Sequence, residues 1–218
     1  TLNKEDFNFT SGFSAYENLT IYNSSDRYQY ILPYYNFDTI LNKKYFNGDI
    51  SINSSGSNNL RETNNLKSNV INNINYTYGD YINNFGLSNN YNISLKNLNS
   101  LGKKNSNYKS SPQIEFVSLF EANSSLPLMK DSINYTNFFT PKISFRLNPH
   151  DMKDYSESEN RIDNGNVFAL NRIGVNDTFE AGRSLTLGLQ YKRERKNLEE
   201  INKFFEFNLA TVIRDKEE

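Results

Sequence analysis

Apolar and polar residues alternate with a period of two in several segments of the chain. The clearest examples are residues 142–148 (KISFRLN) and 184–192 (SLTLGLQYK), and earlier ones are residues 7–15 (FNFTSGFSA) and 74–79 (INYTYG). Successive side chains of a strand point to opposite faces, so this pattern indicates strands with one apolar and one polar face. We therefore predict an all-β chain.

Residues typical of tight turns separate these segments. They occur at Asn47-Gly48, Gly79-Asp80, Gly102-Lys103 and Asn164-Gly165, where a positive φ is tolerated. Two longer polar segments, Ser54 to Ser68 and His150 to Asn166, are the predicted loops. Leu198 to Phe205 has a weak helical period, which we interpret as a turn and the start of a strand. We therefore predict about ten strands in the whole chain, and they are longer and more widely spaced than the strands of a β-sandwich.

The chain contains too little apolar material for the core of a two-sheet fold. Apolar residues make up 36% of it, and the mean hydropathy is −0.74. A membrane barrel removes this difficulty, because the apolar face meets lipid and the polar face lines an aqueous lumen. We predict an antiparallel up-and-down transmembrane β-barrel segment, open as a fragment. Many of the 15 tyrosines would then lie in interfacial girdles.

Charge and cysteine content exclude several other classes. With 24 basic and 25 acidic residues the net charge is −1, so no overall field attracts nucleic acid. No cysteine is present to form disulfides or a thiolate metal site. No GxSxG, P-loop or GxGxxG motif occurs, and one histidine completes no convincing catalytic triad. We predict a protein that is not an enzyme and needs no cofactor.

Two clusters of charged residues are candidate sites with simpler interpretations. His150 lies beside the acidic residues Asp151, Asp154, Glu157, Glu159 and Asp163, but the spacing matches no zinc or calcium site, which favours a solvated loop without a bound metal. The basic run Lys192-Arg193-Glu194-Arg195-Lys196 could contact phosphate groups. We favour a charged hairpin end outside the membrane band.

The chain has the features of a piece of a longer protein. It starts at Thr1 without a signal segment and ends, at IRDKEE, directly after a strand-like run. We expect residues 1–218 to form part of one outer-membrane β-barrel domain.

The segment NVFALNRIGVNDTFEAGRSLTLGLQY resembles the signature of the LptD family (also called OstA or Imp), which assembles lipopolysaccharide in the outer membrane. In that signature a strand of type N-x-F-x-x-N-R is followed by G-x-D-x-x-E-x-G and an alternating strand. The matching positions are Asn166, Phe168, Asn171, Arg172, Gly174, Asp177, Glu180 and Gly182.

Two further segments resemble strands of this family and occur in the expected order. FFTPKISFRLNP contains Pro141 and YQYILPYYNF contains Pro33. Proline removes a donor from the ladder, so we expect a local distortion at each. By resemblance the parent protein has a periplasmic domain before a barrel of about 26 strands, and this chain would be the middle of its wall.

The resemblance implies transport of lipopolysaccharide and its insertion into the outer leaflet of the bacterial outer membrane. The implied partners are lipopolysaccharide, a plug lipoprotein of the LptE type and a periplasmic bridge protein of the LptA type. Leu185, Leu187, Leu189 and Tyr191 would face lipid, whereas Asn171, Arg172 and Glu180 would lie in the lumen or at a strand end and pair with one another.

Two alternatives remain open at this stage. One is another outer-membrane barrel, such as a porin or a TonB-dependent channel. The other is a soluble β-rich surface protein, such as an adhesin or a carbohydrate-binding module, which would show apolar residues on both strand faces or an exposed aromatic platform on one.

Overall fold

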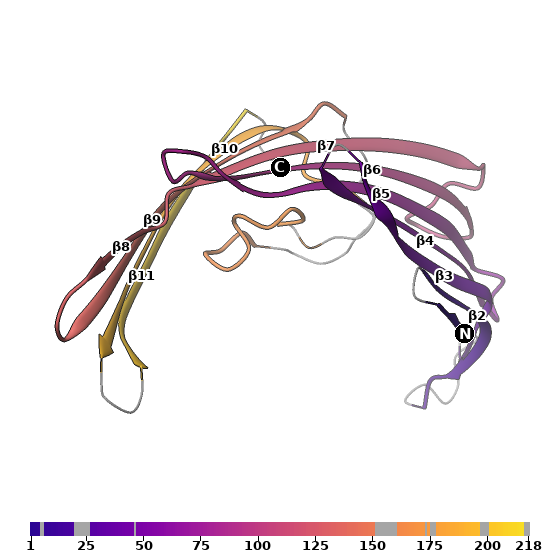
Figure 1. Cartoon of the computed structure of the whole chain (residues 1–218). Coiled ribbons are helices and arrows are strands. Elements are labelled where there is room, and N and C mark those ends of the chain that lie inside the picture. The colour runs from indigo at the N-terminus through magenta and orange to yellow at the C-terminus, as the bar shows by residue number, and fades with distance from the viewer. Residues whose placement is uncertain are drawn as a thin grey trace. The chain divides into compact units, whose positions relative to one another are not determined.

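A computed structural model gives the fold of the chain and describes residues 1–4, 7–19, 27–45, 47–150, 161–172, 174, 178–196 and 201–215. These residues are all-β, which confirms the predicted class (Figure 1). The strands are β1 (Leu2–Asn3), β2 (Phe7–Glu17), β3 (Tyr28–Tyr45), β4 (Gly48–Arg61), β5 (Leu66–Ile82), β6 (Ser88–Lys103), β7 (Gln113–Ser125), β8 (Leu128–Asp131), β9 (Tyr135–Asn148), β10 (Gly182–Lys196) and β11 (Ile201–Arg214).

The strands form one antiparallel sheet of up-and-down topology. Its order is β1-β2-β3-β4-β5-β6-β7-β9-β10-β11, and the short β8 also pairs with β9. The described residues thus form eleven strands, where about ten are predicted. Among the described residues the path ends at β1 and β11 without a pairing between them, which agrees with an open sheet.

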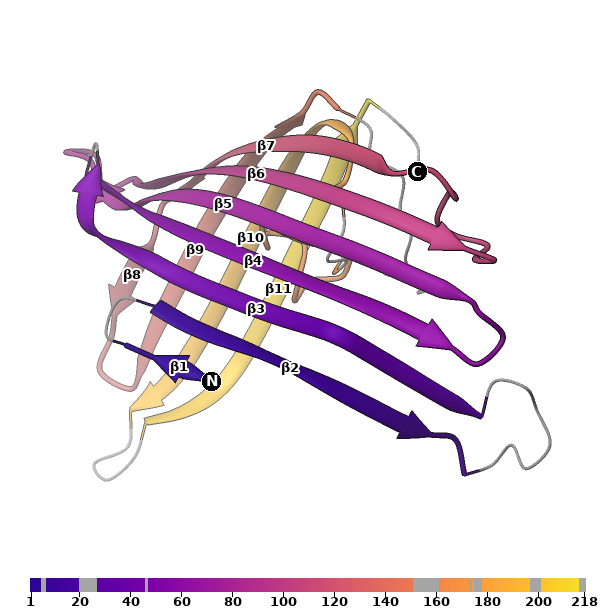
Figure 2. The same cartoon turned by 90° about the vertical axis from the view of Figure 1, so that its right-hand side faces the viewer.

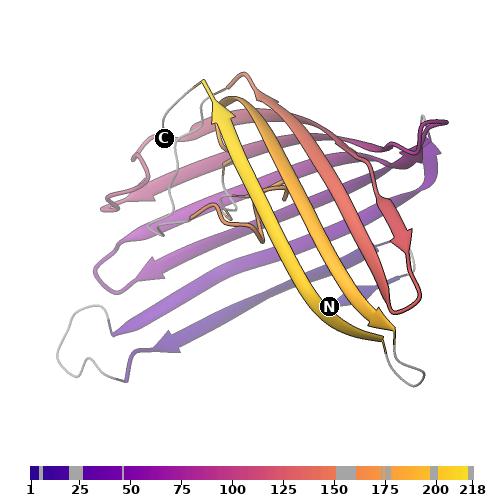
Figure 3. The ribbon, with the colours of Figure 1, turned by 90° about the vertical axis from the view of Figure 1, so that its left-hand side faces the viewer.

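The chain divides into two compact units, and the division passes through strands β5, β6 and β7. The first unit comprises residues 1–76, 94–118 and 152–156, and the second comprises residues 77–93, 119–151 and 157–218. In the first unit β2, β3 and β4 run side by side (Figure 2). In the second unit β9, β10 and β11 do so (Figure 3).

Asparagine and serine side chains link neighbouring strands in the first unit. Ser54 on β4 donates to Asn72 on β5 over 2.6 Å, and Asn72 donates to Asn97 on β6 over 3.0 Å. The predicted loop from Ser54 to Ser68 is therefore wrong, because its ends belong to β4 and β5 and only residues 62–65 turn between them. Its polar side chains form hydrogen bonds with one another between the paired strands.

The remaining turn predictions have mixed outcomes. Asn47 has a φ of 63° between β3 and β4, so a turn forms at the predicted Asn47-Gly48. Gly102 and Lys103 are the last two residues of β6, and the chain turns only from Lys104, which has a φ of 52°. The turn predicted at Gly79-Asp80 is wrong, since both residues belong to β5. The β11 strand begins at Ile201, as the interpretation of Leu198 to Phe205 requires, although residues 197–200 lie outside the described part.

The two prolines differ in their effect on the ladder. The register between β3 and β4 shifts at Ile31 and Tyr34, on either side of Pro33, where a distortion is expected. Pro141 pairs with Leu189 in an uninterrupted register between β9 and β10. On its other side the ladder is interrupted opposite Pro141, between the end of β7 at Ser125 and the start of β8 at Leu128, so the expected distortion occurs there as a break in the neighbouring strand.

Strands β9 and β10 show which side of each strand is covered. On β10, Thr186 is fully buried, whereas Leu187 next to it is 39% exposed. On β9, Ser144, Arg146 and Asn148 are buried, whereas Ile143 and Phe145, on the opposite face, are exposed. The polar face is thus the covered one, the reverse of a water-soluble sheet, which packs its apolar face.

No helix long and apolar enough to cross a membrane occurs among the described residues.

Candidate functional site

The segment between β9 and β10 folds back over the polar face of the second unit. Residues 161–172, the longest described part of the segment, consist mostly of turns and lie apart from the strand ribbons in Figure 1 (orange). The resemblance expects a strand at Asn166 to Arg172, and this expectation is wrong. The chain reverses there repeatedly, and its polar groups bond within the turns and to the sheet.

Asp163 and Asn166 hold the first turn of this segment. The Asp163 carboxylate accepts hydrogen bonds from the backbone N–H groups of Gly165 (2.7 Å) and Asn166 (3.1 Å). In return, the Asn166 side chain accepts from the N–H of Asp163 and donates to the carbonyl of Arg161, each over 2.8 Å. Such Asx bonds offer the backbone an alternative to a strand ladder, which explains the turn.

Phe168 attaches the segment to β10. A Cβ atom added to Gly188 would lie 2.5 Å from Cζ of the Phe168 ring, so the ring rests directly on the glycine backbone. Gly188 is paired with Lys142 on β9 and Ala210 on β11. Small side chains at positions 188 and 210 thus leave room for the aromatic ring on an otherwise polar face.

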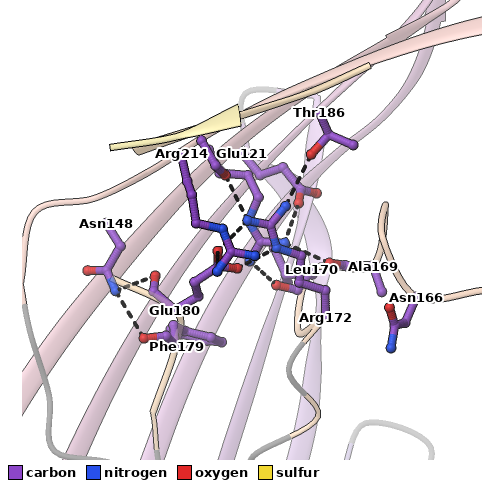
Figure 4. A network of polar contacts seen from close by, with 12 residues as sticks. Glu121, Asn148, Asn166, Ala169, Leu170, Arg172, Phe179, Glu180, Thr186 and Arg214 are labelled. Carbon is purple, nitrogen blue, oxygen red and sulfur yellow. Dashed lines mark hydrogen bonds and ion pairs between the residues drawn. The ribbon is translucent and has the colours of Figure 1, made fainter. Parts of the chain in front are cut away.

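Arg172 and Glu180 form the centre of the buried network (Figure 4). Arg172 is 1% exposed and Glu180 is 6% exposed, and the guanidinium donates to both carboxylate oxygens through Nε and Nη2. The guanidinium also donates to Thr186 Oγ1 over 3.1 Å and to Ser184 Oγ over 2.9 Å. A bidentate pair with two further acceptors satisfies the arginine and links the segment to β10.

A second ion pair joins β7 to β9 below the same segment. Glu121 and Arg146 lie directly opposite each other in the ladder, and Arg146 Nη1 is 3.4 Å from Glu121 Oε2. Arg146 also donates to the backbone carbonyls of Ala169 and Leu170. Asn92 and Asn123 donate to the other Glu121 oxygen over 3.0 and 2.7 Å. Arg146 of β9 therefore binds two backbone carbonyl groups of the segment.

The end of the segment is fixed where β10 begins. Asn148 donates to the carbonyls of Phe179 and Glu180 over 3.3 and 3.0 Å. Gly182 has a φ of 83°, in the left-handed region that favours glycine. Arg214 on β11 lies 3.5 Å from Glu180 Oε1, so a second arginine shares this carboxylate.

Chemically, this network is a structural clamp. The carboxylates of Glu121 and Glu180 are held by three arginines, Arg146, Arg172 and Arg214. No group of three or more potential metal-ligating side chains occurs among the described residues. His150 is exposed, and its backbone N–H donates to Asn148 Oδ1 over 3.1 Å. The predicted acidic neighbours Asp151, Asp154, Glu157 and Glu159 lie outside the described residues.

The basic run at the end of β10 alternates between faces. Arg193 lies on the same face as Leu187, and its Nε donates to Asn137 on β9 over 2.8 Å. Its guanidinium carbon lies 5.5 Å from the centroid of the Tyr135 ring. On the opposite face Lys192 pairs with Glu194, and Lys196 at the strand end pairs with Asp131. This is a charged hairpin end with aromatic neighbours.

Most of the predicted motif residues lie in one region of the second unit. Asn166, Phe168, Arg172, Glu180 and Gly182 take part in the contacts above. Asn171 accepts a backbone bond from Gly174, which has a φ of 70°. Asp177 lies outside the described residues, Pro141 lies in the adjacent β9, and Pro33 belongs to the first unit.

The predicted pairing of Arg172 with Glu180 is present, but Glu121, Arg146 and Asn148 have no place in the sequence prediction. A signal for the last two existed, because both occupy polar positions of the alternating stretch 142–148.

No protein-family model and no curated protein matches the sequence.

Proposed function

We propose that this chain is part of the wall of a bacterial outer-membrane β-barrel of the LptD type, which transports lipopolysaccharide and inserts it into the outer leaflet. The observation that carries the proposal is the inverted sheet of the second unit. Exposed apolar side chains form one face, and charged groups are covered on the other. Lipid on one side and an aqueous lumen on the other are the surroundings in which such a sheet is stable.

The exposed face of β10 has the dimensions of a membrane band. Four apolar side chains, Leu185 to Tyr191, lie between Arg183 and Arg193 on the same face. Ten residues at about 3.4 Å each span about 34 Å along the strand, and a tilt of about 45° reduces this to about 24 Å. An outer-membrane barrel has an apolar band about 25 Å tall, so the arginines fall at its two borders.

Neighbouring strands continue this band. Opposite β10, the same face carries Phe139, Ile143 and Phe145 on β9 and Phe207, Leu209 and Ile213 on β11, and all six are at least 40% exposed. Tyr191 packs against Phe205 with ring centroids 6.0 Å apart, close to Arg193. Aromatic residues at one border are typical of an interfacial girdle.

Transport of lipopolysaccharide rests on the sequence resemblance and on the role of its motif residues. Arg172 and Glu180 keep a long segment on the polar side of β9 and β10, and Phe168 anchors it there. A segment held on the inner wall would shape a lumen through which a large polar headgroup passes. The plug lipoprotein of the LptE type and the periplasmic bridge protein of the LptA type are the partners proposed with this function.

Two measurements test the proposal in sequence. The folded protein should need detergent and should migrate faster on a gel before heating than after it. A photoreactive amino acid at Gln190, on the polar face, should then cross-link lipopolysaccharide in cells, whereas one at Leu187, on the lipid-facing side, reports only lipopolysaccharide that is already in the surrounding membrane. Stable folding in buffer without detergent would contradict the barrel, and cross-links from Leu187 alone would contradict transport along the polar face.

A second candidate function is a solute channel, because a segment lies on the polar face as the constricting loop of a porin does. Porins narrow their pore with an inward loop that carries opposed acidic and basic residues. Here Arg172 and Glu180 bond to each other and are buried, so their charges are not offered to a passing solute. Conductance across a planar bilayer distinguishes the two functions, because an open channel conducts ions without lipopolysaccharide.

A further inference from the structure

Two open cavities lie beside Lys142 on the polar face of the second unit. The larger has a volume of about 200 Å³ and is lined by Ser88, Asn90, Asn123, Ser125, Lys142 and Phe168, among others. The smaller has a volume of about 100 Å³ and extends from Lys142 and Phe168 toward Gln190 and Asn208. Both are bordered by the anchoring ring of Phe168 and are separate from the buried Arg172 network.

Lys142 brings a positive charge that no carboxylate neutralises among the described residues. Its Nζ lies 5.9 Å from the centroid of the Phe168 ring, and its ladder partners are Ser125 on β7 and Gly188 on β10. The two buried carboxylates of this wall, Glu121 and Glu180, are paired with arginines. Lys142 is the only charged residue in the described lining of the larger cavity, which favours an anionic ligand.

The rest of the lining is suited to hydroxyl groups. Asn123 donates to Asn90 and Glu121, and its own carbonyl oxygen is buried without a hydrogen bond. Ser88 and Ser125 add hydroxyls that can both donate and accept. Amides, hydroxyls and one aromatic ring together form a surface for a molecule with several hydroxyls and an apolar ring face.

We propose that the cavity beside Lys142 binds an anionic sugar, which is a single sugar ring carrying a phosphate or a carboxylate. The ammonium binds the anionic group as a point charge, and the asparagine and serine side chains bind the hydroxyls. A volume of about 200 Å³ is below the range of about 300 to 1,000 Å³ for drug-sized ligands. This volume suits a ligand of about one sugar ring.

The origin of this sugar rests on the proposed function, but the chemistry of the cavity does not. A lipopolysaccharide transporter would meet the anionic sugar as part of a lipid headgroup. A solute channel would meet it as a free sugar phosphate.

The test measures binding of glucose 1-phosphate to the full-length protein in detergent micelles by titration calorimetry at low salt. Lys142→Met keeps the length of the side chain and removes its charge, so binding should weaken at least tenfold. Lys130→Met, at an exposed position of β8, is the matched control and should bind like the unmodified protein. Heat-modifiable migration of each variant confirms that it is folded.

A second variant keeps the inference testable if Lys142→Met does not fold. Ser125→Asp places a carboxylate opposite Lys142 in the ladder, and it should weaken binding at least fivefold by pairing with the ammonium. Equal binding by either folded variant, or no binding to the unmodified protein, would overturn the site. Equal affinity for uncharged glucose or for inorganic phosphate would overturn the anionic-sugar specificity.

Competition identifies the source of the ligand. Lipopolysaccharide micelles that displace glucose 1-phosphate from the unmodified protein support a lipid headgroup as the ligand. If glucose 1-phosphate binds through Lys142 but lipopolysaccharide does not displace it, the cavity is retained and the lipid source is rejected. The sugar site and the transport function can therefore fail separately.

Discussion

Replacing Glu180 by glutamine tests the buried clamp most directly. The substitution keeps the shape of the side chain and removes the charge that Arg172 faces. The Arg172 side chain is 0% exposed, and the described residues give it no second carboxylate partner. Arg214 would lose its carboxylate contact with Glu180 in the same step. Glu180→Gln therefore leaves a buried guanidinium without a counter-charge.

The expected cost follows from the geometry of the pair. Removing one partner of a buried ion pair costs about 3 to 5 kcal/mol. Since Ser184 and Thr186 still accept from Arg172 and the glutamine oxygen can accept one bond, we expect the lower end, about 3 kcal/mol. This corresponds to a roughly hundredfold increase in opening of the segment, at about 1.4 kcal/mol per factor of ten. The backbone ladder between β9 and β10 is unchanged, so the cost falls on the segment.

Hydrogen exchange measured by mass spectrometry separates local opening from unfolding. Peptides covering residues 163–172 should exchange roughly a hundredfold faster in Glu180→Gln, while peptides of β10 and β11 keep their protection. Asp215→Asn, which breaks an exposed pair with Arg183, is the control and should leave residues 163–172 unchanged. A double variant, Arg172→Met with Glu180→Leu, should recover part of the protection because it removes both charges together.

Two results would refute this reasoning. Unchanged exchange of residues 163–172 would mean that the ion pair does not hold the segment. Equal acceleration in all strands would mean that the pair stabilises the whole sheet and that the segment has no separate opening.

Three further predictions concern other parts of the second unit. Gly188→Val should displace the Phe168 ring and raise hydrogen exchange of the segment, because the added carbon would meet the ring at 2.5 Å; an unchanged rate would exclude this anchor. Leu187→Arg should lower the free energy of unfolding in lipid vesicles by about 2 to 4 kcal/mol, the cost of arginine on a lipid-facing wall, and a neutral effect would place position 187 outside the membrane. The backbone N–H of Arg183, followed by its guanidinium, lowers the pKa of Asp215 below its ordinary value of 3.8. This contact should therefore stabilise the strand end above pH 3.8 and be lost as the pH falls through the lower pKa, and a carboxyl titration by NMR at or above 3.8 would contradict it.

The strands that carry the inner network could be predicted because their alternation is local. The predicted stretches 142–148 and 184–192 do lie within β9 and β10. They could be recognised because a period of two shows directly which residues share a face of a strand. The prediction of a loop at Ser54 to Ser68, which was made from polarity, was wrong. Its polar residues indicate a loop when each is considered alone, but in the sheet Ser57 donates to Asn69 over 3.0 Å across the β4–β5 hairpin. Polarity in sequence does not distinguish a solvated loop from strands that satisfy each other.

The motif between β9 and β10 shows the same limit. Asn166, Phe168 and Arg172 are recognisable in sequence, and their spacing was interpreted as a strand. The Asx bonds of Asp163 and Asn166 instead favour turns, which place Phe168 on Gly188 and Arg172 among residues of β10.

Local residue order is therefore sufficient to specify extended strands, each with an apolar and a polar side, and to suggest that Arg172 meets Glu180. It is insufficient to show which side is covered, or that Arg146 lies opposite Glu121 and reaches the carbonyls of Ala169 and Leu170. Those contacts depend on strand register and on the path of a returning segment. Both are set by the packing of residues that are far apart in the chain, so they cannot be predicted from any one stretch of the sequence.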